Sequence, residues 1–99
     1  MARAESRITL MLALDPADWR SEDRAGWAES LIRAVEAAAP HLLQVEGYEI
    51  RDTIMYVRIR AADTPGRMRR LLKEDDALIR LRARLADLGA RPEFEIGKL

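Results

Sequence analysis

The sequence contains no cysteine, which excludes disulfide bonds, thiolate metal ligands and a cysteine nucleophile. His41 is the single histidine, and without a second histidine or a cysteine no metal site is expected. Acidic and basic residues balance at 17 each, so the chain lacks the basic excess that phosphate binding usually requires. We therefore expect neither a metal nor a nucleic acid partner.

Long hydrophobic runs are also missing. The apolar segment that ends before Asp15 is too short for a signal peptide and far too short to cross a bilayer. We expect a soluble cytoplasmic protein with no membrane partner. Its 99 residues are enough for one hydrophobic core, and they predict a single domain over residues 1–99.

The most informative feature present is an internal repeat, because residues 7–48 and 56–97 follow the same order of strand, helix and strand. The aligned positions are Ile8, Leu10 and Leu12 with Val57, Ile59 and Ala61, Pro16 with Pro65, and Pro40 with Gly89. Two such halves predict an α+β fold, the ferredoxin-like βαββαβ arrangement. The expected sheet has four antiparallel strands and both helices on one face.

The two helical segments differ in their expected continuity. A short turn at Asp15–Asp18 precedes the first helix, whose apolar stripe includes Trp27, Leu31 and Val35 and which ends at Pro40. An unbroken second helix from Pro65 to Leu88 would be about 36 Å long, which is too long for so small a sheet. We therefore predict a break at Lys73–Asp76, with Asp75 as a new N-cap and Gly89 as the terminator.

The expected strands cover residues 7–14, 42–50, 54–61 and 91–96. In the second strand the apolar spacing changes phase at Gly47, which predicts a β-bulge. Pro92 marks the last strand as an edge strand or a strand start.

The sheet face opposite the helices is the main candidate surface. Its central strands present Met11, Ala13, Ile54 and Tyr56, flanked by charges of both signs that include Arg58 and Arg60. Three interpretations stay open: a solvated sheet with cross-strand ion pairs, a dimer contact, or a ligand-lined cavity.

Two other residues have chemical potential. His41 follows the helix-ending Pro40 and can act as a general base, or can simply lie in solvent at a helix end. Trp19 follows the first strand, where an aromatic side chain can cover a pocket or anchor a turn.

The pattern from Asp15-Pro16-Ala17-Asp18 through Pro40-His41-Leu42-Leu43 and Gly47-Tyr48-Glu49 to the broken second helix resembles the dimeric α+β barrel superfamily. This superfamily includes antibiotic-biosynthesis monooxygenases and small polyketide cyclases. The resemblance implies a homodimer whose sheets pack by their open faces, with a pocket in each subunit between the sheet and the helices. It also implies an aromatic or polyketide-like ligand and no cofactor. A Glu-Trp pair common in the monooxygenases is replaced here by Ile59-Arg60, and the tail of the cyclases is missing.

The segment Asp63-Thr64-Pro65-Gly66 is similar to the Asp-x-Pro-Gly motif of ligand-sensing ACT domains, although that family has it in the first half of the domain. This leaves an ACT-like small-molecule sensor as an alternative. A second alternative is a non-catalytic module that uses the open face for binding or assembly.

The preferred hypothesis is a homodimer, and whether it is a small cofactor-free enzyme stays open. Under this hypothesis His41 or Tyr56 transfers a proton, and Arg58 stabilises a developing enolate or phenolate. Met11, Trp19 and Arg60 are the expected ligand-binding residues, with Trp19 gating the pocket.

Overall fold

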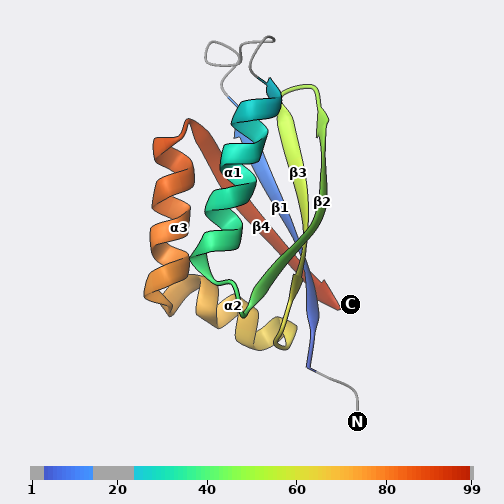
Figure 1. Cartoon of the computed structure of the whole chain (residues 1–99). Helices are drawn as coiled ribbons and strands as arrows, with labels where there is room; N and C mark the ends of the chain where they lie inside the picture. The colour runs from blue at the N-terminus through green and yellow to red at the C-terminus, as the bar shows by residue number, and fades with distance from the viewer. Residues whose placement is uncertain (1–3, 15–23, 99) are drawn as a thin grey trace.

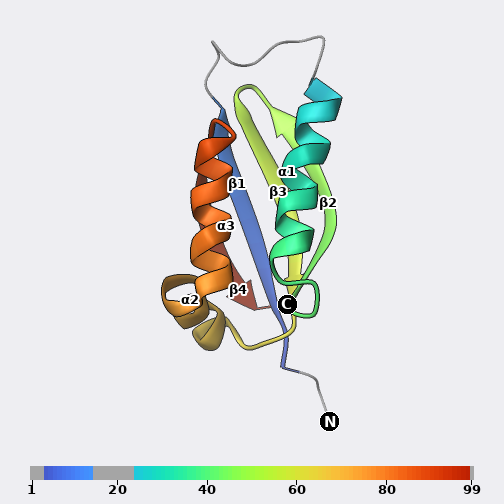
Figure 2. The same ribbon diagram turned by 60° about the vertical axis from the view of Figure 1, so that its left-hand side comes forward.

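The computed structural model describes residues 4–14 and 24–98, which form one sheet and one layer of helices. The elements in chain order are β1 (Ser6–Leu14), α1 (Arg24–Ala38), β2 (Leu43–Arg51), β3 (Ile54–Ala61), α2 (Pro65–Glu74), α3 (Asp76–Asp87) and β4 (Ala90–Lys98). Figure 1 shows α1 and α3 side by side over one face of the sheet, and the turned view in Figure 2 shows the same arrangement.

The sheet has the strand order β2-β3-β1-β4, and every neighbouring pair is antiparallel. This arrangement confirms the predicted ferredoxin-like fold, with β1 in a central position and β4 at an edge. Pro92 lies in this edge strand, where a residue without an N–H group is tolerated.

Three strands differ slightly from their expected bounds. β1 pairs with β4 from Ser6 opposite Lys98 to Leu14 opposite Ala90, so β4 is longer than the 91–96 expected. β1 starts one residue earlier than expected, and β2 runs one residue later at both ends.

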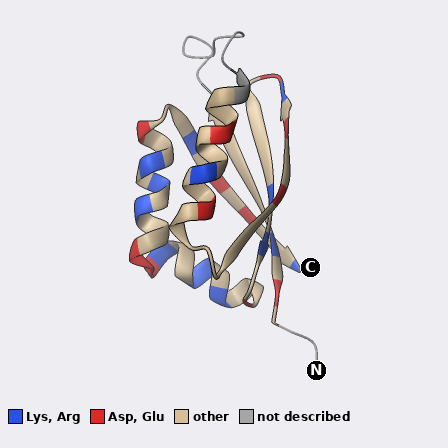
Figure 3. Ribbon diagram, in the orientation of Figure 1, with Lys and Arg blue, Asp and Glu red and all other residues tan. Residues whose placement is uncertain are grey.

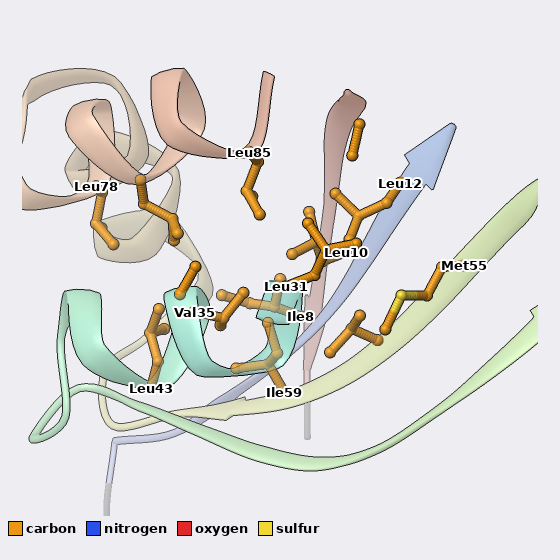
Figure 4. Packing of buried hydrophobic residues seen from close by; sticks show 14 of the residues in the cluster. Ile8, Leu10, Leu12, Leu31, Val35, Leu43, Met55, Ile59, Leu78 and Leu85 are labelled. Atoms are coloured by element: carbon orange, nitrogen blue, oxygen red, sulfur yellow. The ribbon is translucent and has the colours of Figure 1, made fainter. Parts of the chain in front are cut away.

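The hydrophobic core lies between the helices and one face of the sheet. Ile8, Leu10 and Leu12 alternate along β1 and are completely buried, as are Met55, Val57 and Ile59 on β3. Leu31 and Val35 of α1 and Leu78 and Leu85 of α3 cover them from above. Figure 4 shows these side chains converging between the two layers. Buried residues therefore recur at every second position on the strands and about every 3.6 positions on the helices, and both sets pack into one core.

A β-bulge in β2 keeps that strand in phase with the core. The register shifts between Val45 and Gly47, so Val45 lies opposite Ile59 while Tyr48 lies opposite Val57. Both halves of β2 then point their apolar side chains toward the helices. This confirms the bulge predicted at Gly47.

The second helical segment is broken at Asp75, as predicted. The Asp75 N–H donates to the carbonyl of Leu71 at 2.8 Å, and its Oδ2 accepts from the Leu78 N–H at 3.2 Å. Asp75 is thus both the C-cap of α2 and the N-cap of α3. Gly89 follows α3 with a φ of 87°, a left-handed conformation that glycine adopts without steric penalty.

The end of α3 is also tied to α1. Trp27 donates a hydrogen bond from Nε1 to the carbonyl of Leu88 at 3.2 Å, while its ring packs against the core. This contact gives the indole nitrogen a partner and satisfies one carbonyl at the helix end.

The Asp63–Gly66 segment forms the start of α2. Thr64 is the N-cap and accepts from the Arg67 N–H at 3.3 Å, while Asp63 pairs with the Arg67 guanidinium at 2.9 Å. Gly66 has open space around it. The polar groups of this motif are therefore used to begin a helix.

The short turn predicted at Asp15–Asp18 lies outside the described residues. Within the described ranges no helix is both long and apolar enough to span a membrane.

We predict that Asp75→Ala lowers the free energy of unfolding by about 1 kcal/mol, because α3 loses its N-cap acceptor. Asp75→Asn keeps an acceptor and should lose much less. The matched control is Glu74→Ala, which removes a neighbouring exposed carboxylate that caps no helix. Urea unfolding of the three variants measures the difference, and equal values for Asp75→Ala and Glu74→Ala would contradict the prediction.

Candidate functional site on the open face of the sheet

The face of the sheet that points away from the helices forms the candidate site, and we call it the open face. Pairing places Met11 of β1 opposite Tyr56 of β3, and Ala13 opposite Ile54. These four side chains are half-buried, although no helix of the described chain covers them. The centre of the open face is thus apolar, as the sequence predicted.

Charged side chains surround this centre on all four strands. On β3, Arg58 lies opposite Thr9 and Arg60 lies opposite Arg7. On β4, Glu93 and Glu95 follow the same face. Among the described residues Arg60 pairs with Glu46 at 3.4 Å, whereas Arg7, Arg58, Glu93 and Glu95 have no ion pair. The open face therefore carries unpaired charges of both signs.

Tyr56 is held in place by a charged neighbour that the sequence analysis did not identify. The Arg51 guanidinium carbon lies 4.9 Å from the centre of the Tyr56 ring, and the same guanidinium pairs with Glu49 at 2.8 Å. This cation–π contact restrains the orientation of the Tyr56 ring. Since the hairpin places Arg51 opposite Ile54, the register of β2 and β3 was the signal that could have revealed this contact.

Arg58 lies over the bulge in β2. A Cβ atom added to Gly47 would be 2.6 Å from the Arg58 Nη2, closer than real side chains allow. Glycine at this position therefore does two things, because it forms the bulge and leaves space for the guanidinium. Arg58 is thereby placed along the surface of the open face.

His41 lies away from the open face. It lines a cavity of about 640 Å³ beside the first residues of β2. Arg60 also lines this cavity, together with Glu36 and Gln44. Tyr56 is four residues from Arg60 along β3, which is about 13 Å in an extended strand. No hydrogen bond joins His41 to Tyr56. The structure thus brings Met11, Tyr56 and Arg58 together on the open face and His41 and Arg60 together in this cavity, which we call the β2-end cavity.

The remaining candidate, Trp19, lies outside the described residues. Within the described part of the chain no group of three or more histidine, aspartate or glutamate side chains is arranged to hold a metal ion. The chemistry available on the open face is therefore a phenol, guanidinium groups, carboxylates and an apolar surface.

No family model matches the chain, and no curated protein matches it in sequence. The solved structures that share its fold include the following two. The de novo designed protein Foldit4 has a TM-score of 0.53 at 16% identity, over 96% of this chain and 98% of that one. The "putative antibiotic biosynthesis monooxygenase" from Caulobacter crescentus CB15 has a TM-score of 0.54 at 14% identity, over 98% of this chain and 91% of that one.

We predict an energetic coupling between Gly47 and Arg58. In the wild-type background Gly47→Ala forces the guanidinium to move, whereas in an Arg58→Ala background the three nearest atoms that the added methyl group would meet are gone. A double-mutant cycle by urea unfolding should give a coupling of about 0.5–1 kcal/mol. Gly97→Ala is the control, because a Cβ there meets no atom within 4 Å. A Gly47–Arg58 coupling no larger than that of the Gly97 control would contradict the contact.

At these levels of identity the two neighbours show the fold and not the activity, and one of them was designed rather than evolved. The chain accordingly has the ferredoxin-like α+β fold that its sequence predicted, and it shares this fold with both neighbours.

Proposed function

We propose that the protein is a homodimer whose two open faces pack together around a small aromatic or polyketide-like molecule. The observation that carries this proposal is the apolar centre of the open face, formed by Met11, Ala13, Ile54 and Tyr56 and covered by no helix of the described residues. Contiguous apolar surface bounded by charges is typical of an interaction site.

The unpaired charges support a second copy as the covering partner. Glu93 and Glu95 lack basic partners within the described chain, and Arg7 and Arg58 lack acidic ones. A two-fold interface brings the same surface of each subunit against the other, so one chain can offer its carboxylates to the guanidinium groups of its partner. The open face is therefore suited to pairing with itself.

The chemistry proposed for the ligand follows from the residues that share this face. Tyr56 supplies a planar ring and a hydroxyl group that can transfer a proton, and Arg58 can stabilise an enolate or phenolate that develops beside it. Met11 on β1 lies directly opposite Tyr56. The proposed reaction uses no cofactor.

His41 is the alternative proton carrier, and it acts in a different place. It lines the β2-end cavity with Arg60, so a substrate processed by His41 binds at the edge of the sheet. Mutating His41 and Tyr56 one at a time distinguishes the two assignments, because no hydrogen bond links these residues. The Caulobacter protein that shares this fold is described as a "putative antibiotic biosynthesis monooxygenase", and the proposal is compatible with that description.

The dimer is tested by molar mass. We expect light scattering at micromolar concentration to give twice the chain mass of 11.3 kDa. Tyr56→Asp should shift the mass toward the monomer, because it buries an unpaired charge in the interface. The control is Ile79→Asp on α3, where the native side chain is already 45% exposed. A wild-type monomer, or equal masses for both variants, would remove the barrel hypothesis.

Ligand binding is tested with 1,8-dihydroxyanthraquinone as the probe, titrated by calorimetry. Arg58→Ala should weaken binding about tenfold, the effect of losing one charge-assisted hydrogen bond. Arg67→Ala on α2 is the matched control and should leave the affinity unchanged. A His41→Ala variant that weakens binding more than Arg58→Ala would move the site to the β2-end cavity. A dimer that binds no such probe would favour an assembly module.

A further inference from the structure

Besides the β2-end cavity, a second concave surface lies in the helical layer. This layer is on the other side of the sheet from the open face. α1 and α3 run side by side there, and a groove of about 600 Å³ lies between them. It extends along α1 from Ser30 to Ala38, which is about 12 Å of helix. We call this surface the α1–α3 groove.

The floor of the α1–α3 groove is apolar and shallow. Ala34, Ala38 and Ala77 contribute methyl groups, and the buried side chain of Leu81 lies at the bottom. Alanine side chains let two helices leave space between them that larger residues would fill. The floor therefore offers a smooth hydrocarbon surface about as large as a small-molecule site.

The rim of the groove carries three guanidinium groups and no carboxylate. Arg33 comes from α1, and Arg80 and Arg84 come from α3. Arg33 pairs with Glu29 at 3.5 Å, but both side chains are largely exposed, so this pair is weak. Within the described chain Arg80 donates only to the Asp76 carbonyl, and Arg84 has no ion pair. In Figure 3 the middle of α3 is correspondingly blue between red ends.

The two guanidinium groups from α3 repel each other weakly in the isolated chain. Arg80 and Arg84 are four residues apart on one helix, a spacing at which like charges repel. A carboxylate between them would remove the repulsion and could accept hydrogen bonds from two planar guanidinium groups. The groove thus combines an anion-binding rim with a hydrocarbon floor.

We propose that the α1–α3 groove binds an amphipathic organic carboxylate, with its acid group at Arg80 and Arg84 and its hydrocarbon chain along the alanine floor. Peptide-binding grooves usually contain deep pockets for large anchor residues, and this floor has none. The site is separate from the open face, so the proposal does not depend on the dimer or on the ligand proposed there.

The probe for the experiment is dodecanoate, titrated into the full chain and followed by amide chemical shifts in NMR spectra. We expect shifts at Ala34, Ala38, Ala77 and Leu81. Arg84→Ala should weaken binding about tenfold. The matched control is Arg82→Ala, which removes a guanidinium from the same helix but one that lies over Phe94, 5.4 Å from its ring centre. Tyr56→Asp should bind dodecanoate like the wild type.

Two further measurements make the result decisive. Ala37→Trp places a large side chain at an exposed position of the groove and should block dodecanoate while leaving the fold intact. Dodecyltrimethylammonium, which has the same chain length and a positive head group, should not bind there. Equal losses for Arg84→Ala and Arg82→Ala, or tight binding of the cationic probe, would overturn the proposal. So would binding to phosphatidylglycerol vesicles that Ala37→Trp leaves unchanged, since it would assign the arginines to a membrane surface.

Discussion

The rest of the structure depends on the one-sided burial of the two central strands. Ile8, Leu10 and Leu12 on β1 and Met55, Val57 and Ile59 on β3 are fully buried beneath the helices, and they form most of the core floor. Because successive strand residues point to opposite faces, fixing these six side chains also fixes what lies on the other side. Met11, Tyr56 and Arg58 lie on the open face as a direct geometric consequence. The candidate site is therefore set by the core.

The bulge at Gly47 lets both halves of β2 point apolar side chains toward the helices. A regular strand would have pointed either Val45 or Tyr48 away from the helices, since the two are an odd number of positions apart. The register shift keeps both opposite core residues of β3. The same missing side chain leaves room for the Arg58 guanidinium. A local irregularity that serves packing thus also leaves space for a charged group on the open face.

Features that depend on local pattern could be predicted from the sequence, and features that depend on the packing of distant segments could not. The internal repeat, the break at Asp75, the bulge and the left-handed Gly89 all follow from residue spacing and backbone preference. The grouping of His41 with Arg60, and of Tyr56 with Arg51, depends on strand register and on where a loop ends. The α1–α3 groove depends on how closely two helices approach. Spacing within one helix shows which residues share a face, but it does not show how wide the gap to the next helix is.

Net charge conceals how charge is distributed on this molecule. The 17 acidic and 17 basic residues cancel over the chain, and that balance argues against a phosphate backbone as the main partner. Each face nevertheless has its own pattern, with both signs unpaired on the open face and only positive charge on the rim of the α1–α3 groove. A mixed face favours association with a copy of itself, because each sign finds its opposite across a two-fold axis. A rim of one sign favours a small anion instead. The two faces of this fold are thus suited to different partners, and binding at one does not require the other.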